Sequence, residues 1–218
     1  MWNIEDVIQS YLKDPKFKSN FKDKIKNSVR SNSSEWDHRI MKSSKSILTA
    51  VCFRETAIAS LESQDSLVYQ PIGLYYSMFH ISMAMCWINP RVRLEDLKHI
   101  QHAKLLRIIE SQFVQNHFVP QSFFDVMSKL KELREACNYQ FGYQDNLELE
   151  VRNAVEESER AFDCAFQFIH QVLNASASLF RVQVGIGDGF GDQILDSYLS
   201  KEHKENVFDF LVQNGLSS

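Results

Sequence analysis

The stretch Gly73-Leu-Tyr-Tyr-Ser-Met-Phe-His-Ile-Ser-Met-Ala-Met-Cys-Trp87 is the hydrophobic centre of the chain. Apolar side chains at Ile72, Tyr76, Phe79 and Met83 follow one another at the helical spacing of four, three and four residues. The other side of the same helix is also largely apolar, so no face is clearly suited to water. A helix that is apolar all round is normally buried on every side. The stretch is therefore predicted to be the central helix of a bundle.

The composition fits one globular domain with appendages. The chain has 218 residues, of which 44% are hydrophobic and 24% charged, enough to bury a sizeable core. A net charge of −4 gives no global nucleic-acid signature, so RNA binding would need a local basic patch. The polar N-terminus and the absence of a confident membrane span predict a cytoplasmic protein without membrane contact. Four widely spaced cysteines without a CxxC pair favour free thiols in a reducing compartment.

The fold class expected from the sequence is all-α. Only seven glycines and four prolines interrupt the chain, and long segments follow the 3.6-residue period. A short charged connection is expected at Arg91–Asp96. The helices are expected over about 33–62, 71–89, 102–116, 123–137 and 147–180, the last of them roughly 50 Å long.

Three regions divide the chain. Residues 1–32 form a basic leader, interpreted as a short helix with a solvated connector or as an arm that touches RNA phosphates or a partner subunit. Residues 33–182 form the bundle, and residues 183–218 form a glycine-rich hinge with two short C-terminal helices. Glycine-rich loops can cradle phosphate, but that fingerprint follows a strand, which the sequence does not predict here.

Two motifs on the second and fourth helices resemble a known family. They are Tyr75-Tyr-Ser-Met-Phe-His80 and Leu133-Arg-Glu-Ala-Cys-Asn-Tyr139, with His99 or His102 opening the helix between them. Their order over about residues 35–180 resembles the HEPN family of prokaryotic helical domains. The resemblance implies an up-and-down bundle of four to five helices, usually a homodimer. It also implies a role in RNA cleavage, antiviral defence or toxin–antitoxin pairs, with RNA, a nucleotide or a nucleotidyltransferase-type protein as partner.

Catalytic members of that family carry an arginine followed, after four to six residues, by a histidine. Arg134 is in place, but Gln140 and Phe141 stand where the histidine is expected. The resemblance therefore favours an RNA- or nucleotide-related dimer with a degenerate motif. The alternative is a metal-independent endoribonuclease that uses Arg134 with Tyr139, although a tyrosine with a pKa near 10 is a poor base at neutral pH.

Arg134 is the residue on which the functional interpretation depends. It follows Leu130 by four residues and so leaves the apolar face of its helix. An arginine there needs a partner, because an unpaired buried charge is costly. One interpretation is an internal salt bridge or a dimer contact. The other is an RNA- or ligand-binding patch with Asn138, Tyr139 and Tyr143, in which arginine contacts phosphate and tyrosines stack on bases.

The histidines give weaker signals. His80 is expected to be a core histidine, with a catalytic role as the alternative. His99 and His102 have a spacing that can chelate a metal, but no third ligand is evident, so neither a metal nor a cofactor is expected. Arg93 and His99 match the family spacing formally, but they lie before the third helix and are interpreted as a coincidence.

Overall fold

The structure is a computed structural model that describes residues 33–62, 69–139 and 147–180. Within these ranges every regular element is a helix and no strand is present, so the all-α prediction is confirmed. The elements are α3 (Ser33–Glu62), α4 (Tyr69–Ile88), α5 (Leu94–Leu97), α6 (His102–Ile109), the π-helix η1 (Glu110–Val114), α7 (Gln121–Tyr139) and α8 (Leu147–Phe180).

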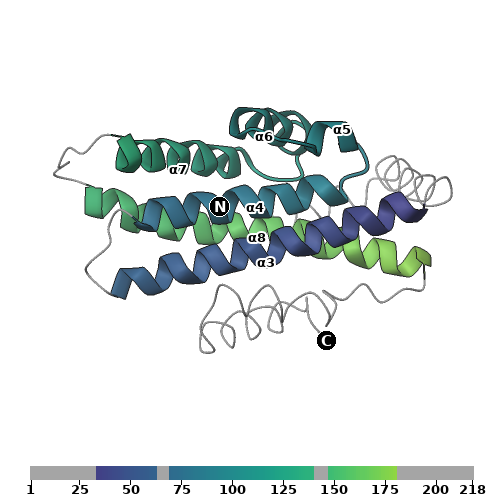
Figure 1. The fold of residues 1–218 in the computed structure, drawn as a ribbon, viewed down its shortest axis with the longest axis horizontal. Helices are drawn as coiled ribbons and strands as arrows, with labels where there is room; N and C mark the ends of the chain where they lie inside the picture. Colours follow the sequence, from purple (N-terminus) through teal and green to yellow (C-terminus); the bar gives the residue numbers. More distant parts are fainter. Residues whose placement is uncertain (1–32, 63–68, 140–146, 181–218) are drawn as a thin grey trace.

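Helix α4 lies at the centre of the bundle. It contacts α3, α5, α6, α7 and α8, and Figure 1 shows it running between α3 on one side and α6 and α7 on the other. Most of its side chains are buried, and Tyr75, Met78 and Ile81 are among the largest that are fully buried. The burial of α4 on every side follows from its lack of a polar face, as the sequence predicts.

Gly73 allows α3 and α4 to pack closely. A Cβ atom at this position would lie 2.9 Å from the Cβ of Ala57 and 3.4 Å from the carbonyl oxygen of Phe53, both on α3. Glycine inside a helix costs about 0.5–1 kcal/mol relative to alanine. Here that cost is offset by the close approach of the two helices.

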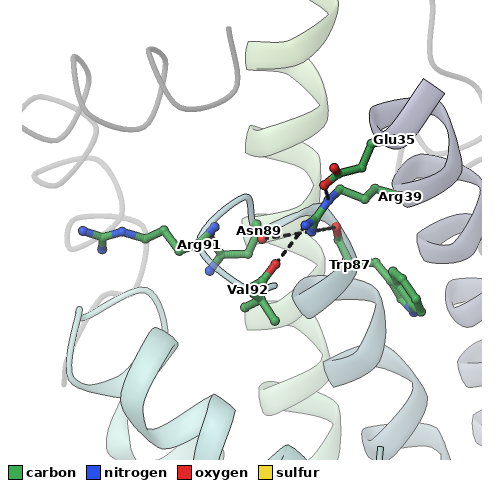
Figure 2. Close-up of polar contacts among 6 residues, drawn as sticks. All are labelled: Glu35, Arg39, Trp87, Asn89, Arg91 and Val92. Atoms are coloured by element: carbon green, nitrogen blue, oxygen red, sulfur yellow. Dashed lines mark hydrogen bonds and ion pairs between the residues drawn. The ribbon is translucent and has the colours of Figure 1, made fainter. Parts of the chain in front are cut away.

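Arg39 ties α3 to the C-terminal end of α4 (Figure 2). Its Nε donates to Glu35 at 2.8 Å, one turn earlier on α3. Its Nη1 donates to the carbonyl oxygens of Trp87 at 3.1 Å and Asn89 at 3.4 Å, and its Nη2 donates to that of Val92 at 2.9 Å. The last carbonyl groups of a helix have no partner within the helix, and Arg39 supplies donors for them.

This network explains how a buried arginine is accommodated. Only 4% of Arg39 is exposed, and each of the three guanidinium nitrogens has an acceptor. Glu35 therefore does more than favour the positive end of its helix, the role its position predicts, because it also neutralises Arg39.

Two local elements differ from expectation. The charged connection after Pro90 contains the one-turn helix α5, and the helix that begins at His102 changes to a π-helix at Glu110. Asn116 supports the end of this wider turn, because its side-chain amide donates to the carbonyl oxygens of Ser111 and Gln112. The chain then reverses at His117, whose φ of 58° lies in the left-handed region.

The predicted leader 1–32 and the predicted hinge and helices at 183–218 lie outside the described residues. Among the described residues, no helix is long and apolar enough to cross a membrane. The four cysteines are free thiols, with Cys86 and Cys164 buried and Cys52 and Cys137 partly buried.

Candidate functional site

Helix α7 places Arg134 beside the core, as its spacing from Leu130 predicts. Leu130 is fully buried and Leu133 is nearly so, and only 11% of the Arg134 side chain is exposed. The apolar stripe of α7 packs on α4 and α8 and carries the arginine inward with it. Arg134 is thus a nearly buried cation at the junction of α7 and α4.

The guanidinium group of Arg134 lies over two tyrosines of α4. Its central carbon is 4.7 Å from the ring centroid of Tyr75 and 5.9 Å from that of Tyr76. Such cation–π contacts stabilise by about 0.5–2 kcal/mol, depending on desolvation. The two sequence motifs therefore meet in space, although about 60 residues of chain separate them.

Among the described residues, one donor atom of Arg134 has no partner and another has a long contact. Its Nε atom is buried and has no hydrogen-bond partner among the described residues. Its Nη2 lies 3.5 Å from Oε1 of Glu135, which is its neighbour in sequence and is 42% exposed. A guanidinium group offers five N–H donors. Within the described parts of the chain, the internal salt bridge considered from sequence is this one contact of 3.5 Å.

His102 lies at the same site, although it is not the histidine that the family spacing places after Arg134. It is the first residue of α6, and its Nδ1 lies 2.5 Å from the hydroxyl oxygen of Tyr75. Its ring also packs against Phe79, with centroids 4.8 Å apart. Tyr75 therefore contacts His102 at its hydroxyl end and Arg134 over its ring.

Both His102 and Tyr75 are neutral at pH 7. Burial, and then the positive charges of Arg134 and Lys131, hold the pKa of His102 below its usual 6.5. Burial raises the pKa of Tyr75 to about 12, against the opposing effect of Arg134. A phenol is a better donor than acceptor and an unprotonated imidazole nitrogen is a good acceptor, so Tyr75 donates to Nδ1. Nε2 of His102 then carries the ring proton.

The structure does not show where the side chains of the other predicted site residues lie. The side chains of Asn138 and Tyr139, at the end of α7, and the whole of Tyr143 lie outside the described parts of the structure. The predicted catalytic pair of Arg134 and Tyr139 and the predicted binding patch therefore stay predictions, except for the position of Arg134.

The remaining histidine motifs do not form sites. His99 is exposed and has a φ of 55°, so it precedes α6 and does not share a helix face with His102. Across the described residues, no group of three or more His, Cys, Asp or Glu is placed to hold a metal ion. Arg93, which matches the family spacing with His99, is 75% exposed and pairs with Asp96 at 2.9 Å.

His80 lies in a different aromatic environment. Its ring is parallel to that of Phe53 of α3, with centroids 5.7 Å apart, and it meets the edge of Phe79. Burial lowers its pKa to about 4. His80 is therefore neutral at pH 7, and it is a half-buried residue that packs on Phe53 and Phe79.

Comparisons with protein-family models, with curated proteins and with solved structures find no match to this chain. The cluster of Arg134, Tyr75 and His102 and the sequence motifs are therefore the features of the chain that bear on its function.

Proposed function

We propose that this chain is an RNA-binding helical protein in which Arg134 receives a phosphate group of the RNA backbone. The observation that carries the proposal is the state of the guanidinium group. It is nearly buried, held over Tyr75, and left with a buried Nε that has no partner among the described residues and one 3.5 Å contact. A buried polar group without a partner costs about 1–3 kcal/mol, and a bound anion would remove that cost.

The geometry favours binding of an anion over activation of a nucleophile. Tyr75 occupies Nδ1 of His102, so the imidazole offers an N–H donor at Nε2 and no free basic nitrogen. A guanidinium group and a neutral imidazole N–H are both suited to phosphate oxygens. The interpretation of the motif as degenerate, with binding retained and cleavage lost, is therefore the primary proposal.

The wider biological role in this proposal comes from the sequence motifs. Membership of the HEPN family, a homodimer, a cytoplasmic location and a role in antiviral defence or a toxin–antitoxin pair all follow from the resemblance at Tyr75–His80 and Leu133–Tyr139. A nucleotidyltransferase-type partner belongs to the same expectation. What supports it physically is the contact between the two motifs through Arg134 and Tyr75.

A second candidate is a metal-independent endoribonuclease. It is favoured by His102, whose lowered pKa gives a neutral imidazole beside Arg134 at pH 7. Cleavage would require the Tyr75 hydrogen bond to be exchanged for one to the 2′-hydroxyl of the RNA, since a general base needs a free nitrogen lone pair. His102 then replaces Tyr139 as the proton carrier expected for this candidate.

The test is the affinity of the purified protein for a fluorescently labelled oligouridylate, measured by anisotropy. Arg134→Ala is expected to weaken binding by about tenfold or more, because charge-assisted hydrogen bonds contribute about 1.5–3 kcal/mol. Arg107→Ala removes the same charge from an exposed position of α6 and serves as the control. Equal affinities of the two variants would refute the binding proposal. Metal-free cleavage of the same RNA, lost in His102→Ala, would establish the second candidate instead.

A further inference from the structure

Lys131, Arg134 and Glu135 form a charged group on α7 that runs from the nearly buried Arg134 to the partly exposed Lys131 and Glu135. The Nζ of Lys131 lies 3.0 Å from Oε1 of Glu135, and Nη2 of Arg134 lies 3.5 Å from the same oxygen. One carboxylate oxygen is thus shared by two cations, one on the preceding turn of the helix and one directly before it in sequence. Nothing in the sequence motifs distinguishes Lys131 or Glu135.

The carboxylate is held at this position only loosely. The side chains of Glu135 and Lys131 are 42% and 29% exposed, so both reach solvent, whereas Arg134 is 11% exposed. Exposed ion pairs of this kind contribute about 0–1 kcal/mol. Arg134, in contrast, is nearly buried and held over Tyr75, so the guanidinium group stays in place when the carboxylate leaves.

We propose that Lys131 and Arg134 together clamp one phosphate group of an RNA chain, and that Glu135 is the resident anion which this phosphate displaces. The shared carboxylate oxygen marks where a phosphate oxygen would sit. Lys131 is the flexible point charge of the clamp and Arg134 is the planar, fixed donor, a division that matches the chemistry of the two side chains. The clamp rests on the proposed RNA binding at Arg134.

The clamp also explains why a nearly buried arginine is stable without RNA. The hydrogen bond from Lys131, and the charges of Lys131 and Arg134, hold the pKa of Glu135 below its usual 4.5. The carboxylate is therefore ionised at neutral pH and partly neutralises Arg134. RNA must compete with it, which makes Glu135 a restraint on affinity.

Four charge-removing variants of α7 test the clamp, with the same oligouridylate as probe. Lys131→Gln is expected to lower affinity about fivefold, whereas Lys129→Gln, which removes the same charge from a lysine paired with Glu157 at 2.9 Å, changes it less than twofold. Glu135→Gln is expected to raise affinity about threefold more than Glu132→Gln, an exposed control on the same helix.

The double variant Arg134→Ala/Glu135→Gln distinguishes two effects of removing Glu135. One is the loss of a carboxylate that competes with RNA for Arg134, and the other is the loss of one negative charge near the RNA. If Glu135 competes for Arg134, its removal gains less in this background than in the wild type. The clamp is refuted if Lys131→Gln behaves like Lys129→Gln and Glu135→Gln behaves like Glu132→Gln, even where Arg134→Ala abolishes binding. A wild-type protein that does not bind the probe refutes both the clamp and the proposed function.

Discussion

Arg39 and Arg134 are both largely buried, yet their surroundings differ in a way that separates structure from binding. Arg39 donates to Glu35 and to the carbonyl oxygens of Trp87, Asn89 and Val92. Arg134 has a buried Nε without a partner among the described residues and one ion pair of 3.5 Å. Burial alone therefore does not identify a functional arginine. What distinguishes the two is how much of the hydrogen-bonding capacity the fold itself uses.

The origin of the partners differs as well. Those of Arg39 are mostly main-chain carbonyl oxygens, of Trp87 near the end of α4 and of Asn89 and Val92 in the connection that follows. Those of Arg134 are an aromatic face and an exposed carboxylate that can move away. The first arrangement fixes the geometry of α3 against α4, and the second leaves room for a ligand. This difference is tested by measuring unfolding free energy and RNA affinity for variants of both arginines and of their neighbours.

The largest effect is expected for Arg39→Ala. It removes the ion pair with Glu35 and the donors to the carbonyl oxygens of Trp87, Asn89 and Val92, which predicts a loss of about 3–5 kcal/mol of unfolding free energy. Urea denaturation followed by circular dichroism measures it. Arg160→Ala on α8 is the control, because Arg160 is 81% exposed and its ion pair is 3.8 Å long. A loss below 1 kcal/mol for Arg39→Ala would contradict its structural role.

The next effect concerns pH and involves His80. Its pKa of about 4 is depressed by burial, so the folded state binds fewer protons than the unfolded state between about pH 6.5 and 4. Stability from this group is complete above pH 6.5 and is lost as the pH falls toward 4, by about 3 kcal/mol in total.

The variant His80→Phe keeps the packing against Phe53 and removes the titration. Its unfolding free energy is therefore expected to fall less than that of the wild type between pH 7 and pH 4, as measured by urea denaturation at each pH. Parallel curves for the two proteins would show that His80 is protonated without penalty. This result would mean that the His80 imidazole is hydrated in the folded state, and that its role is not structural.

A smaller effect is expected where α3 and α4 touch. Gly73→Ala introduces a Cβ 2.9 Å from that of Ala57, and overpacking of this kind costs about 1–3 kcal/mol. The second-site change Ala57→Gly removes the opposing atom, so the double variant is expected to be more stable than the sum of the two single changes. Thermal denaturation of the four proteins measures this coupling. If the effects of the two single changes on stability simply add, α3 and α4 can move apart at this position without cost.

The sequence predicts the long helices well because their apolar periodicity is a local property. The bounds expected for α3 and α8 agree with the structure, and α4 is the central helix as its composition indicates. The π-helix η1 depends instead on side-chain contacts from Asn116, and these have no periodic signature.

The candidate site is predictable only in part, for the same reason. The position of Arg134 beside the core follows from its spacing to Leu130. The contact of His102 with Tyr75 joins residues 27 apart in sequence, and those of Arg39 span about 50 residues. Such pairs depend on how helices pack, which the pattern of a single helix does not contain. The available signal is that the motif order places His99 or His102 at the start of a helix, and the structure begins α6 at His102.

The most direct test of the central claim measures unfolding free energy and oligouridylate affinity on the same Arg134→Ala preparation. The contact with Tyr75 is lost, but so is the buried Nε without a partner, so stability is expected to change by no more than about 1 kcal/mol. Affinity is expected to fall about tenfold or more. A variant that unfolds as readily as Arg39→Ala while binding RNA as tightly as the wild type would make Arg134 a second structural arginine, and would contradict the account.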